Sequence, residues 1–179
     1  MAEDKKEKWL SYMAITTVIV AVCATFSTFK GGGYSTKSLM NQSLASDNYS
    51  FFQSKSIKSN IIEMNRDNLE LQKEVLPANT DASKIGSYNK RIDGYTNKIN
   101  RYTHEKDSIQ KIAEGFKAEV GVCKRHSEAF GFAVIFLQIS ILLSSISALA
   151  KKHYIYYLSL VVAVFGVFYF LDGWFLFLK

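Results

Sequence analysis

Proline, cysteine and histidine are scarce in this sequence. Its 179 residues include one proline, two cysteines and three histidines. Because proline breaks the interior of a helix, its near absence favours long helices. Cys23 lies in an apolar stretch and Cys123 in a polar one, so we do not expect them to form a disulfide with each other.

Motifs that carry catalysis are also missing. The chain has no Gly-x-Ser-x-Gly elbow and no dinucleotide-binding fingerprint, and His104 with Glu105 lacks the second histidine of a zinc-protease helix. A phosphate loop has glycine immediately before its lysine, whereas Thr36 occupies that position before Lys37. We therefore predict no enzymatic activity, no catalytic residue, no cofactor and no metal.

Charge is confined to particular segments. Residues 31–129 hold 15 Lys/Arg and 12 Asp/Glu, a net charge of +3 (15 − 12) out of +6 for the chain. This mixture is typical of a solvated helical surface and argues against a nucleic-acid partner. The remaining lysines lie at the edges of apolar segments, where they anchor helix ends to lipid headgroups. They are Lys5, Lys6, Lys8, Lys30, Lys151, Lys152 and Lys179.

What the sequence does have is three long apolar segments, at residues 9–29, 130–150 and 154–178, the first preceded by a charged segment at 1–8. A helix rises about 1.5 Å per residue, so each can cross a hydrocarbon core of about 30 Å. Each carries small residues at helical spacing, a pattern typical of close helix packing in membranes. These are Ala14, Thr17, Ala21, Thr25 and Thr28, then Ser140, Ser144, Ser147 and Ala148, then Ser159, Ala163, Gly166 and Gly173.

Residues 30–129 have the pattern of two helices joined by a turn near residues 77–82. Both predicted arms carry apolar residues spaced three and four apart, which predicts an antiparallel coiled-coil hairpin. The first seam is Ile57, Ile61, Met64, Asn68, Leu71 and Val75. The second is Ile85, Tyr88, Ile92, Tyr95, Ile99, Tyr102, Ile109, Ile112, Phe116, Val120 and Cys123. The predicted fold class is an all-α membrane protein with three transmembrane helices and this hairpin between the first and second.

Two features of the hairpin suggest positional roles. Gly31, Gly32 and Gly33 follow the first apolar segment, and we expect them to end or bend the helix at the membrane surface. Asn68 interrupts the first seam. It is either a buried asparagine that sets the register, or the seam drifts to Leu69 at this point, and the sequence leaves both open.

Polar residues inside the apolar segments are candidate functional or packing positions. Asp172 is the only acid of the third segment, and an acid within a span often marks an ion path. It lies near the end of its segment, beside Gly173 and Trp174, which favours an interfacial or packing carboxylate. Gln138 lies near the serines of the second segment, where we expect contacts between helices.

A metal site is a weaker alternative. Glu119, Cys123 and His126 are spaced four and three residues apart, so they share one face of a helix. No fourth ligand is evident, and the edge of a coiled coil near the membrane is the favoured interpretation.

Several stretches resemble one family of bacterial membrane proteins. They are Lys8-Trp9-Leu10, Ala14-Ile15-Thr16-Thr17-Val18, Cys23-Ala24-Thr25, Ser27 to Thr36, Ala45-Ser46-Asp47, Tyr49, Phe51-Phe52-Gln53 and Lys55-Ser56-Ile57-Lys58. The chain is similar to the family known only as domain of unknown function 4337, over most of its length. This resemblance implies a bacterial membrane protein and implies no activity.

We therefore expect a non-enzymatic scaffold in the lipid bilayer, assembled as a homo-oligomer through the hairpin and the spans. Aromatic residues such as Phe51, Phe52, Tyr88, Tyr95 and Tyr102 suggest further helices packing on the hairpin. Two alternatives stay open: an ion-conducting, stator-like channel subunit, or an accessory subunit of a larger membrane complex. The resemblance implies a bacterial membrane, which we take to be the inner membrane. Residues 1–8 and the 151–153 loop together carry five lysines. Because segments longer than about 60 residues weigh little in the positive-inside rule, the hairpin is discounted, and the five lysines then favour a cytoplasmic N-terminus and an extracytoplasmic hairpin.

Overall fold

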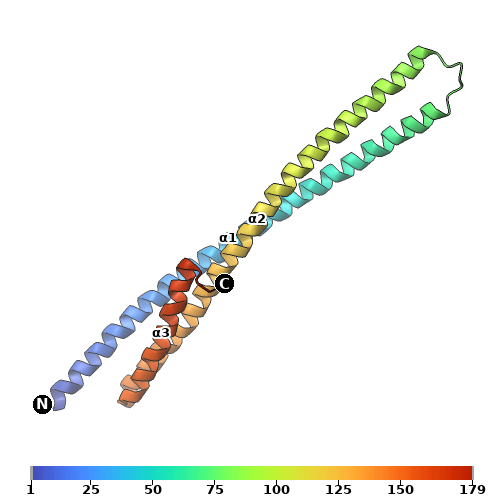
Figure 1. The fold of residues 1–179 in the computed structure, drawn as a ribbon. Helices are drawn as coiled ribbons and strands as arrows, with labels where there is room; N and C mark the ends of the chain where they lie inside the picture. The colour runs from blue at the N-terminus through green and yellow to red at the C-terminus, as the bar shows by residue number, and fades with distance from the viewer. Residues whose placement is uncertain (1, 179) are drawn as a thin grey trace. The chain divides into compact units, whose positions relative to one another are not determined.

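The computed structural model describes the backbone of residues 2–178 and the side chains of residues 9–178. The chain is all-α and forms three long helices, α1 (Ala2–Glu74), α2 (Ala82–Ala150) and α3 (His153–Phe175), packed antiparallel in chain order. All three are long and apolar enough to cross a membrane. The contacts divide the described chain into a three-helix unit (residues 2–40 and 119–178) and a two-helix unit (Asn41–Ala118). Figure 1 shows the three helices as coiled ribbons.

Helix α1 runs without interruption through Gly31, Gly32 and Gly33. The predicted helix break at these glycines is therefore wrong. A helical glycine costs only about 1 kcal/mol relative to alanine, and α1 makes tertiary contacts here that offset this cost. The Ser127 hydroxyl donates a hydrogen bond to the Gly31 carbonyl over 3.0 Å, and a Cβ on Gly31 would lie 3.1 Å from the Phe130 Cβ.

The turn between α1 and α2 contains the only proline of the chain. The Thr80 N–H donates to the Pro77 carbonyl over 3.0 Å, which closes the turn. The Asp81 carboxylate then accepts the Ser83 N–H at 3.1 Å, so Asp81 acts as the N-cap of α2. Helix α2 continues from here into the second apolar segment without a break, as predicted.

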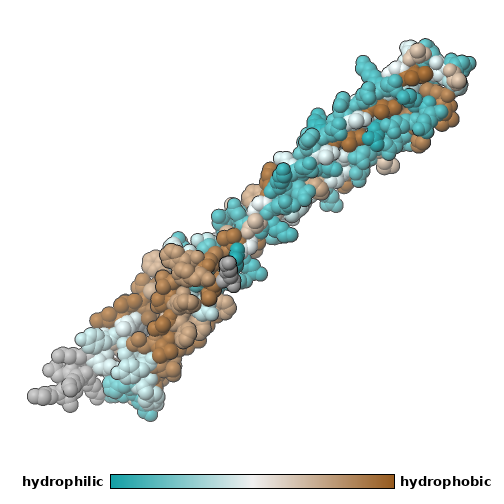
Figure 2. Space-filling model, in the orientation of Figure 1, coloured by the Kyte–Doolittle hydropathy of each residue, from teal (hydrophilic) through white to brown (hydrophobic). Residues whose placement is uncertain are grey.

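The three-helix unit buries small side chains and exposes large ones. Its buried residues include Ala24, Ser27, Ala129, Ala133, Ser140, Ser144, Ser147, Ser159, Gly166 and Gly173, with Met13, Phe130, Leu137 and Tyr156 as the large exceptions. Leucine, isoleucine, valine and phenylalanine side chains cover much of the outside. Figure 2 shows this surface as mostly brown, whereas the surface of the two-helix unit is mostly teal.

In the two-helix unit, α2 contacts α1 through nearly the predicted residues. Ile85, Tyr88, Ile92, Tyr95, Ile99, Tyr102, Ile109 and Phe116 are all partly buried. The one shift is that Ala113 is buried while Ile112 is exposed. Tyr88, Tyr95 and Tyr102 lie inside this contact and are partly buried against α1. The expectation that they pack against further helices is therefore wrong, whereas Phe51 remains exposed.

The seam predicted for the first arm is wrong. Ile57, Ile61, Met64, Leu71 and Val75 are 53–81% exposed. The residues that face α2 instead are Asn41, Ala45, Asn48, Phe52, Lys55, Ser59, Ile62, Arg66, Leu69, Lys73 and Leu76, which also alternate steps of four and three. A long basic side chain can occupy this position because its stem packs on an aromatic ring of α2. The Lys55 Nζ, for example, lies 5.1 Å from the centre of the Tyr102 ring.

Candidate functional site

The contact between helices in the three-helix unit depends on glycine at two positions of α3. A Cβ on Gly166 would lie 2.7 Å from Leu137 Cδ2 and 3.1 Å from the Leu137 backbone nitrogen. A Cβ on Gly173 would lie 2.8 Å from Phe130 Cδ1. Leu137 and Phe130 are fully buried and therefore cannot move aside easily. These two glycines allow α3 to approach α2 closely, as small residues do in membrane helices.

Hydroxyl groups pair with one another within the same contact. Thr17 Oγ1 and Ser144 Oγ are 2.7 Å apart, and Thr16 Oγ1 lies 3.2 Å from the Tyr156 hydroxyl. The Ser140 hydroxyl donates to the Ser159 carbonyl over 2.8 Å. These bonds join α1 to α2, α1 to α3 and α2 to α3, so they connect each pair of helices.

A cavity of about 280 Å³ lies beside these hydroxyls. Its other walls are aliphatic and come from α1, α2 and α3, including Val20, Ile141, Leu160 and Val164. Among the described residues that line it, the phenol of Tyr156 is the only acid or base. The arrangement suits an apolar occupant and offers no nucleophile with an adjacent general base.

Asp172 is buried and fixes the end of α3. Its carboxylate accepts the Leu178 N–H at 2.7 Å, and its carbonyl accepts the Leu176 N–H at 2.7 Å. Leu176 adopts a left-handed backbone with a φ of 51°, which ends the helix. Helix α3 therefore stops at Phe175 and not at the predicted Leu178. In this position the Asp172 carboxylate acts as a structural acceptor.

His126 joins α2 to the same end of α3. Its Nδ1 lies 2.8 Å from the Gly173 carbonyl, so this nitrogen carries the proton of the hydrogen bond. The ring stacks on Tyr34 of α1 at a centroid distance of 4.4 Å. On the other side of this junction, the Lys30 Nζ lies 4.8 Å from the centre of the Trp174 ring. Together these contacts hold all three helices at one level.

The three residues considered as metal ligands point to different partners. Glu119 forms an ion pair with Lys37 at 3.6 Å, Cys123 is buried, and His126 is hydrogen-bonded to Gly173. Among the described side chains, no group of three His, Cys, Asp or Glu residues could hold a metal ion.

The remaining candidate positions lie on outer surfaces. Gln138 is exposed on the outside of the three-helix unit, between the exposed apolar residues Ile135 and Leu142. Asn68 is exposed on α1, away from the α2 contact. Gly32 and Gly33 have open space where a Cβ would be. Of the residues singled out from the sequence, the structure brings Gly31 together with Phe130, and Asp172 with Leu178.

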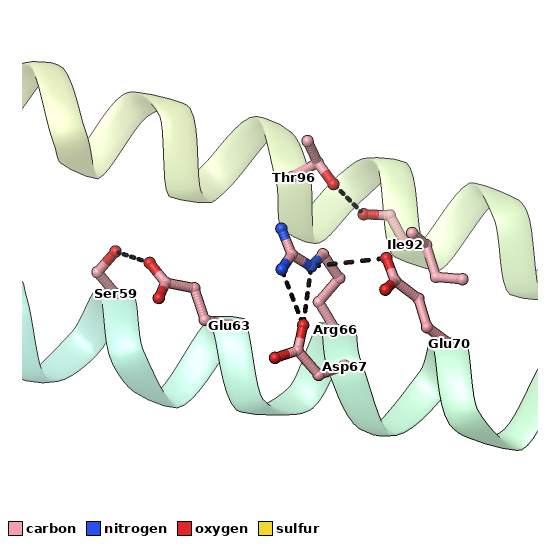
Figure 3. A network of polar contacts seen from close by, with 7 residues as sticks. All are labelled: Ser59, Glu63, Arg66, Asp67, Glu70, Ile92 and Thr96. Atoms are coloured by element: carbon pink, nitrogen blue, oxygen red, sulfur yellow. Dashed lines mark hydrogen bonds and ion pairs between the residues drawn. The ribbon is translucent and has the colours of Figure 1, made fainter.

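Ion pairs stabilise the two-helix unit instead of forming a site. Lys55 of α1 pairs with Glu105 of α2, and the hydrogen bond from the Lys55 ammonium lowers the pKa of the Glu105 carboxyl. Within α1, Arg66 pairs with Asp67 at 2.8 Å and with Glu70 at 3.6 Å (Figure 3). The hydrogen bond to Asp67 raises the pKa of the Arg66 guanidinium.

Comparison with known proteins now gives the family. Residues 9–176 match the model of the family described as Domain of unknown function (DUF4337). The chain belongs to the DUF4337 family. The resemblance seen in the sequence is thereby confirmed. No curated protein and no solved structure matches this DUF4337 chain.

Sequence reasoning missed the role of His126 in this DUF4337 protein. Its partner is a backbone carbonyl 47 positions away, and no local spacing reports such a contact. The sequence offered two signals near this contact: the spacing of His126 with Cys123, and Tyr34 after the three glycines in the stretch that resembles the family. The end of α3 at Phe175 was also not predicted from the sequence, because it depends on hydrogen bonds from Leu176 and Leu178 back to Asp172.

Proposed function

We propose that this DUF4337 protein is a non-enzymatic, multi-pass membrane scaffold that acts as a homo-oligomer. The observation that carries this proposal is the arrangement of the three-helix unit, with small and hydroxyl-bearing side chains inside and large apolar ones outside. In water this arrangement would expose apolar surface on every helix. In a bilayer it places the apolar side chains in lipid and leaves close packing and hydrogen bonds to hold the helices together.

Gln138 supports self-association of the spans. Its amide lies on the apolar outside of α2, where lipid offers it no hydrogen-bond partner. A side-chain amide in this position is stabilised when it bonds to a neighbouring helix. The same residue of a second copy supplies both a donor and an acceptor, so two Gln138 amides satisfy each other.

The contacts of Asp172 favour a scaffold over an ion-conducting subunit. A carboxylate on an ion path needs to face a hydrated route. Asp172 is 4% exposed and accepts a backbone N–H from Leu178. A scaffold uses this carboxylate to close a helix, and Asp172→Asn preserves the accepting oxygen. We therefore expect the asparagine variant to accumulate in the membrane like the unmodified chain.

Crosslinking in native membranes tests the proposal. A lysine-reactive crosslinker on membranes washed with alkaline carbonate is expected to give dimers or larger species of the full chain. Release of the protein by the carbonate wash would contradict membrane insertion. Recovery of monomer alone at every crosslinker dose would contradict the scaffold, whatever the behaviour of Asp172→Asn.

The orientation of the hairpin is the second part of the proposal. We infer a cytoplasmic N-terminus and an extracytoplasmic two-helix unit from the five lysines of residues 1–8 and 151–153, because a segment as long as the hairpin weighs little in the positive-inside rule. Cys123 is too buried to report sidedness, so a cysteine at the exposed Asn79 of the turn, in a chain with Cys23→Ala and Cys123→Ala, is the better probe. Labelling of intact spheroplasts by an impermeant maleimide is expected. Labelling only after lysis would reverse the orientation.

A further inference from the structure

Helix α1 carries an apolar stripe that nothing in the two-helix unit covers. The stripe, which we call the outer stripe, consists of Ile57, Ile61, Met64, Asn68, Leu71 and Val75. Its five apolar members are among the exposed large hydrophobic residues, and Asn68 is exposed with them. Along the sequence, α2-facing residues lie two positions from members of the stripe. Ser59, for example, is two residues after Ile57 and two before Ile61. Two residues are about 200° of helix rotation, so the stripe lies on the opposite face.

The order of residues in the outer stripe matches a parallel two-stranded coiled coil. The alternating steps of four and three make Ile57, Met64 and Leu71 the d positions of a heptad, and Ile61, Asn68 and Val75 the a positions. Parallel dimers favour β-branched residues at a and leucine at d, and the stripe has Ile61 and Val75 at a and Leu71 at one of its three d positions. Such dimers also tolerate one asparagine at an a position, where the two amides pair and fix both register and strand number.

The charges beside the stripe favour the parallel arrangement as well. In a parallel pair, each g residue faces the e residue five positions later in the other chain. Here that places Asp67 opposite Gln72 and Asn60 opposite Asn65, with no like charges opposed. In the antiparallel register that aligns the same stripe, Asp67 meets Asp67 of the second copy and Asn68 meets Met64. That register opposes like charges and leaves a buried amide unpaired.

We propose that the outer stripe of α1 binds the same stripe of a second copy, in parallel and in register, with Asn68 against Asn68. The inference rests on the proposed membrane scaffold, because insertion in one bilayer gives every copy the same direction. The stripe spans fewer than three heptads, which is short for an independent coiled coil. Confinement of the copies to one membrane supplies the effective concentration that a short stripe needs.

Disulfide crosslinking of the full chain in native membranes tests this interface. The background carries Cys23→Ala and Cys123→Ala, and the probe is Leu71→Cys, at a d position where parallel partners approach each other. Asn97→Cys is the matched control. It is exposed on the far side of α2 from the α1 contact, and the Lys55–Glu105 pair puts it about level with Met64. Mild oxidation is expected to give a several-fold larger dimer fraction for Leu71→Cys than for Asn97→Cys.

A charge at the central position provides the second measurement. Asn68→Lys in the Leu71→Cys chain opposes two ammonium groups and is expected to reduce the disulfide-linked dimer several-fold. Asn97→Lys in the same chain should leave it unchanged. Because Leu71 and Asn68 are exposed, these substitutions do not disturb the hairpin itself.

The outcomes separate the interface from the proposed function. Equal dimer fractions for Leu71→Cys and Asn97→Cys, together with oligomers from the lysine-reactive crosslinker, would overturn the outer-stripe interface and leave the scaffold standing. Monomer in all three experiments would overturn both. A dimer at Leu71→Cys that survives Asn68→Lys would overturn the in-register pairing through Asn68.

Discussion

In the three-helix unit the buried side chains are mostly alanine, serine and glycine, whereas in the two-helix unit isoleucines, tyrosines and the stems of basic residues make the contact. The first unit exposes its large apolar residues on all sides. The second exposes most of its large apolar residues on one stripe of α1, with Tyr49, Phe51 and Ile112 as the exceptions. The same two chain segments, α1 and α2, contribute to both units.

The proposed membrane insertion explains this difference by the solvent of each unit, lipid for the first and water for the second. Water drives large apolar side chains into contact with one another, so isoleucine and tyrosine make the α2 seam. Lipid supplies no such drive, and helices then associate where small residues let their backbones approach. The outer stripe carries large apolar side chains, which water drives into contact, yet no part of the two-helix unit covers it. For this reason we assign it to contact with a second copy.

The largest difference between the two units is expected when an acid is placed on the outside of each, and the stronger effect is expected on α3. Val161 is exposed near the middle of α3, outside the cavity, and Val161→Asp places a carboxylate there. Such a charge costs about 3 kcal/mol at the centre of a membrane helix. We expect loss of the chain from the carbonate-resistant membrane fraction, measured by immunoblot. Asn97→Asp in the two-helix unit should leave that fraction unchanged, and equal behaviour of the two variants would argue against insertion of α3.

Glycine substitutions sharpen the contrast between packed and open positions. Gly166→Ala forces a Cβ against Leu137 and should destabilise the three-helix unit by about 1–3 kcal/mol. Gly32→Ala meets nothing within 4 Å and should stabilise α1 by up to about 1 kcal/mol, since alanine is the better helix former. Thermal unfolding in detergent, followed by tryptophan fluorescence, measures both. The two variants are expected to change the thermal midpoint in opposite directions. A lower midpoint for Gly32→Ala would support the break in α1 that the sequence predicts.

The hydroxyl pair between α1 and α2 should contribute a smaller coupling. Thr17→Val and Ser144→Ala each remove one partner of the 2.7 Å hydrogen bond. Bonds of this kind between membrane helices contribute about 0.6 to 2 kcal/mol. In a double-mutant cycle, the losses in the free energy of unfolding of the two single variants are expected to sum to more than the loss of the double variant, by that amount. Simple additivity would mean that close packing alone holds these two helices.

The ion pair of the two-helix unit should have the smallest effect, because both side chains are about one-third exposed. The Lys55 ammonium lowers the pKa of Glu105 below its ordinary value of 4.5. The pair therefore stabilises the fold above pH 4.5, and this contribution is lost as the pH falls through the lowered pKa. Glu105→Gln should lower the thermal midpoint slightly at pH 7, and the difference should vanish at acidic pH. A difference that grows as the pH falls would contradict this assignment.

How much the sequence could predict depends on whether a pattern is local. The α2 seam was correct because isoleucine and tyrosine recur on one face and no competing face exists. On α1, two faces carry the same spacing, and the more apolar one was chosen. The other face holds Phe52, Ile62, Leu69 and Leu76 with Lys55 and Arg66 among them, and of these only Leu69 was considered as a seam position. The contact of Lys55 with Tyr102 and its ion pair with Glu105, both on the opposing helix, show why a basic side chain fits there.

The candidate sites show the same limit. The small-residue stripes of the spans were visible in the sequence, and Gly166 and Gly173 are indeed closely packed. The contacts of Asp172 and His126 were not visible, because they bring together residues of α2, of α3 and of the segment that follows α3. The glycines at 31–33 were misjudged because their helical cost is local and the packing that offsets it is not.

The central claim is that this chain is inserted in a membrane and assembled with copies of itself. Native mass spectrometry of the full chain, released from lipid nanodiscs, tests it most directly. The account predicts species of at least twice the mass of the chain. Asn68→Lys should shift the distribution toward monomer, and Asn97→Lys should not. Monomer alone, over the full range of protein-to-lipid ratios, would contradict it.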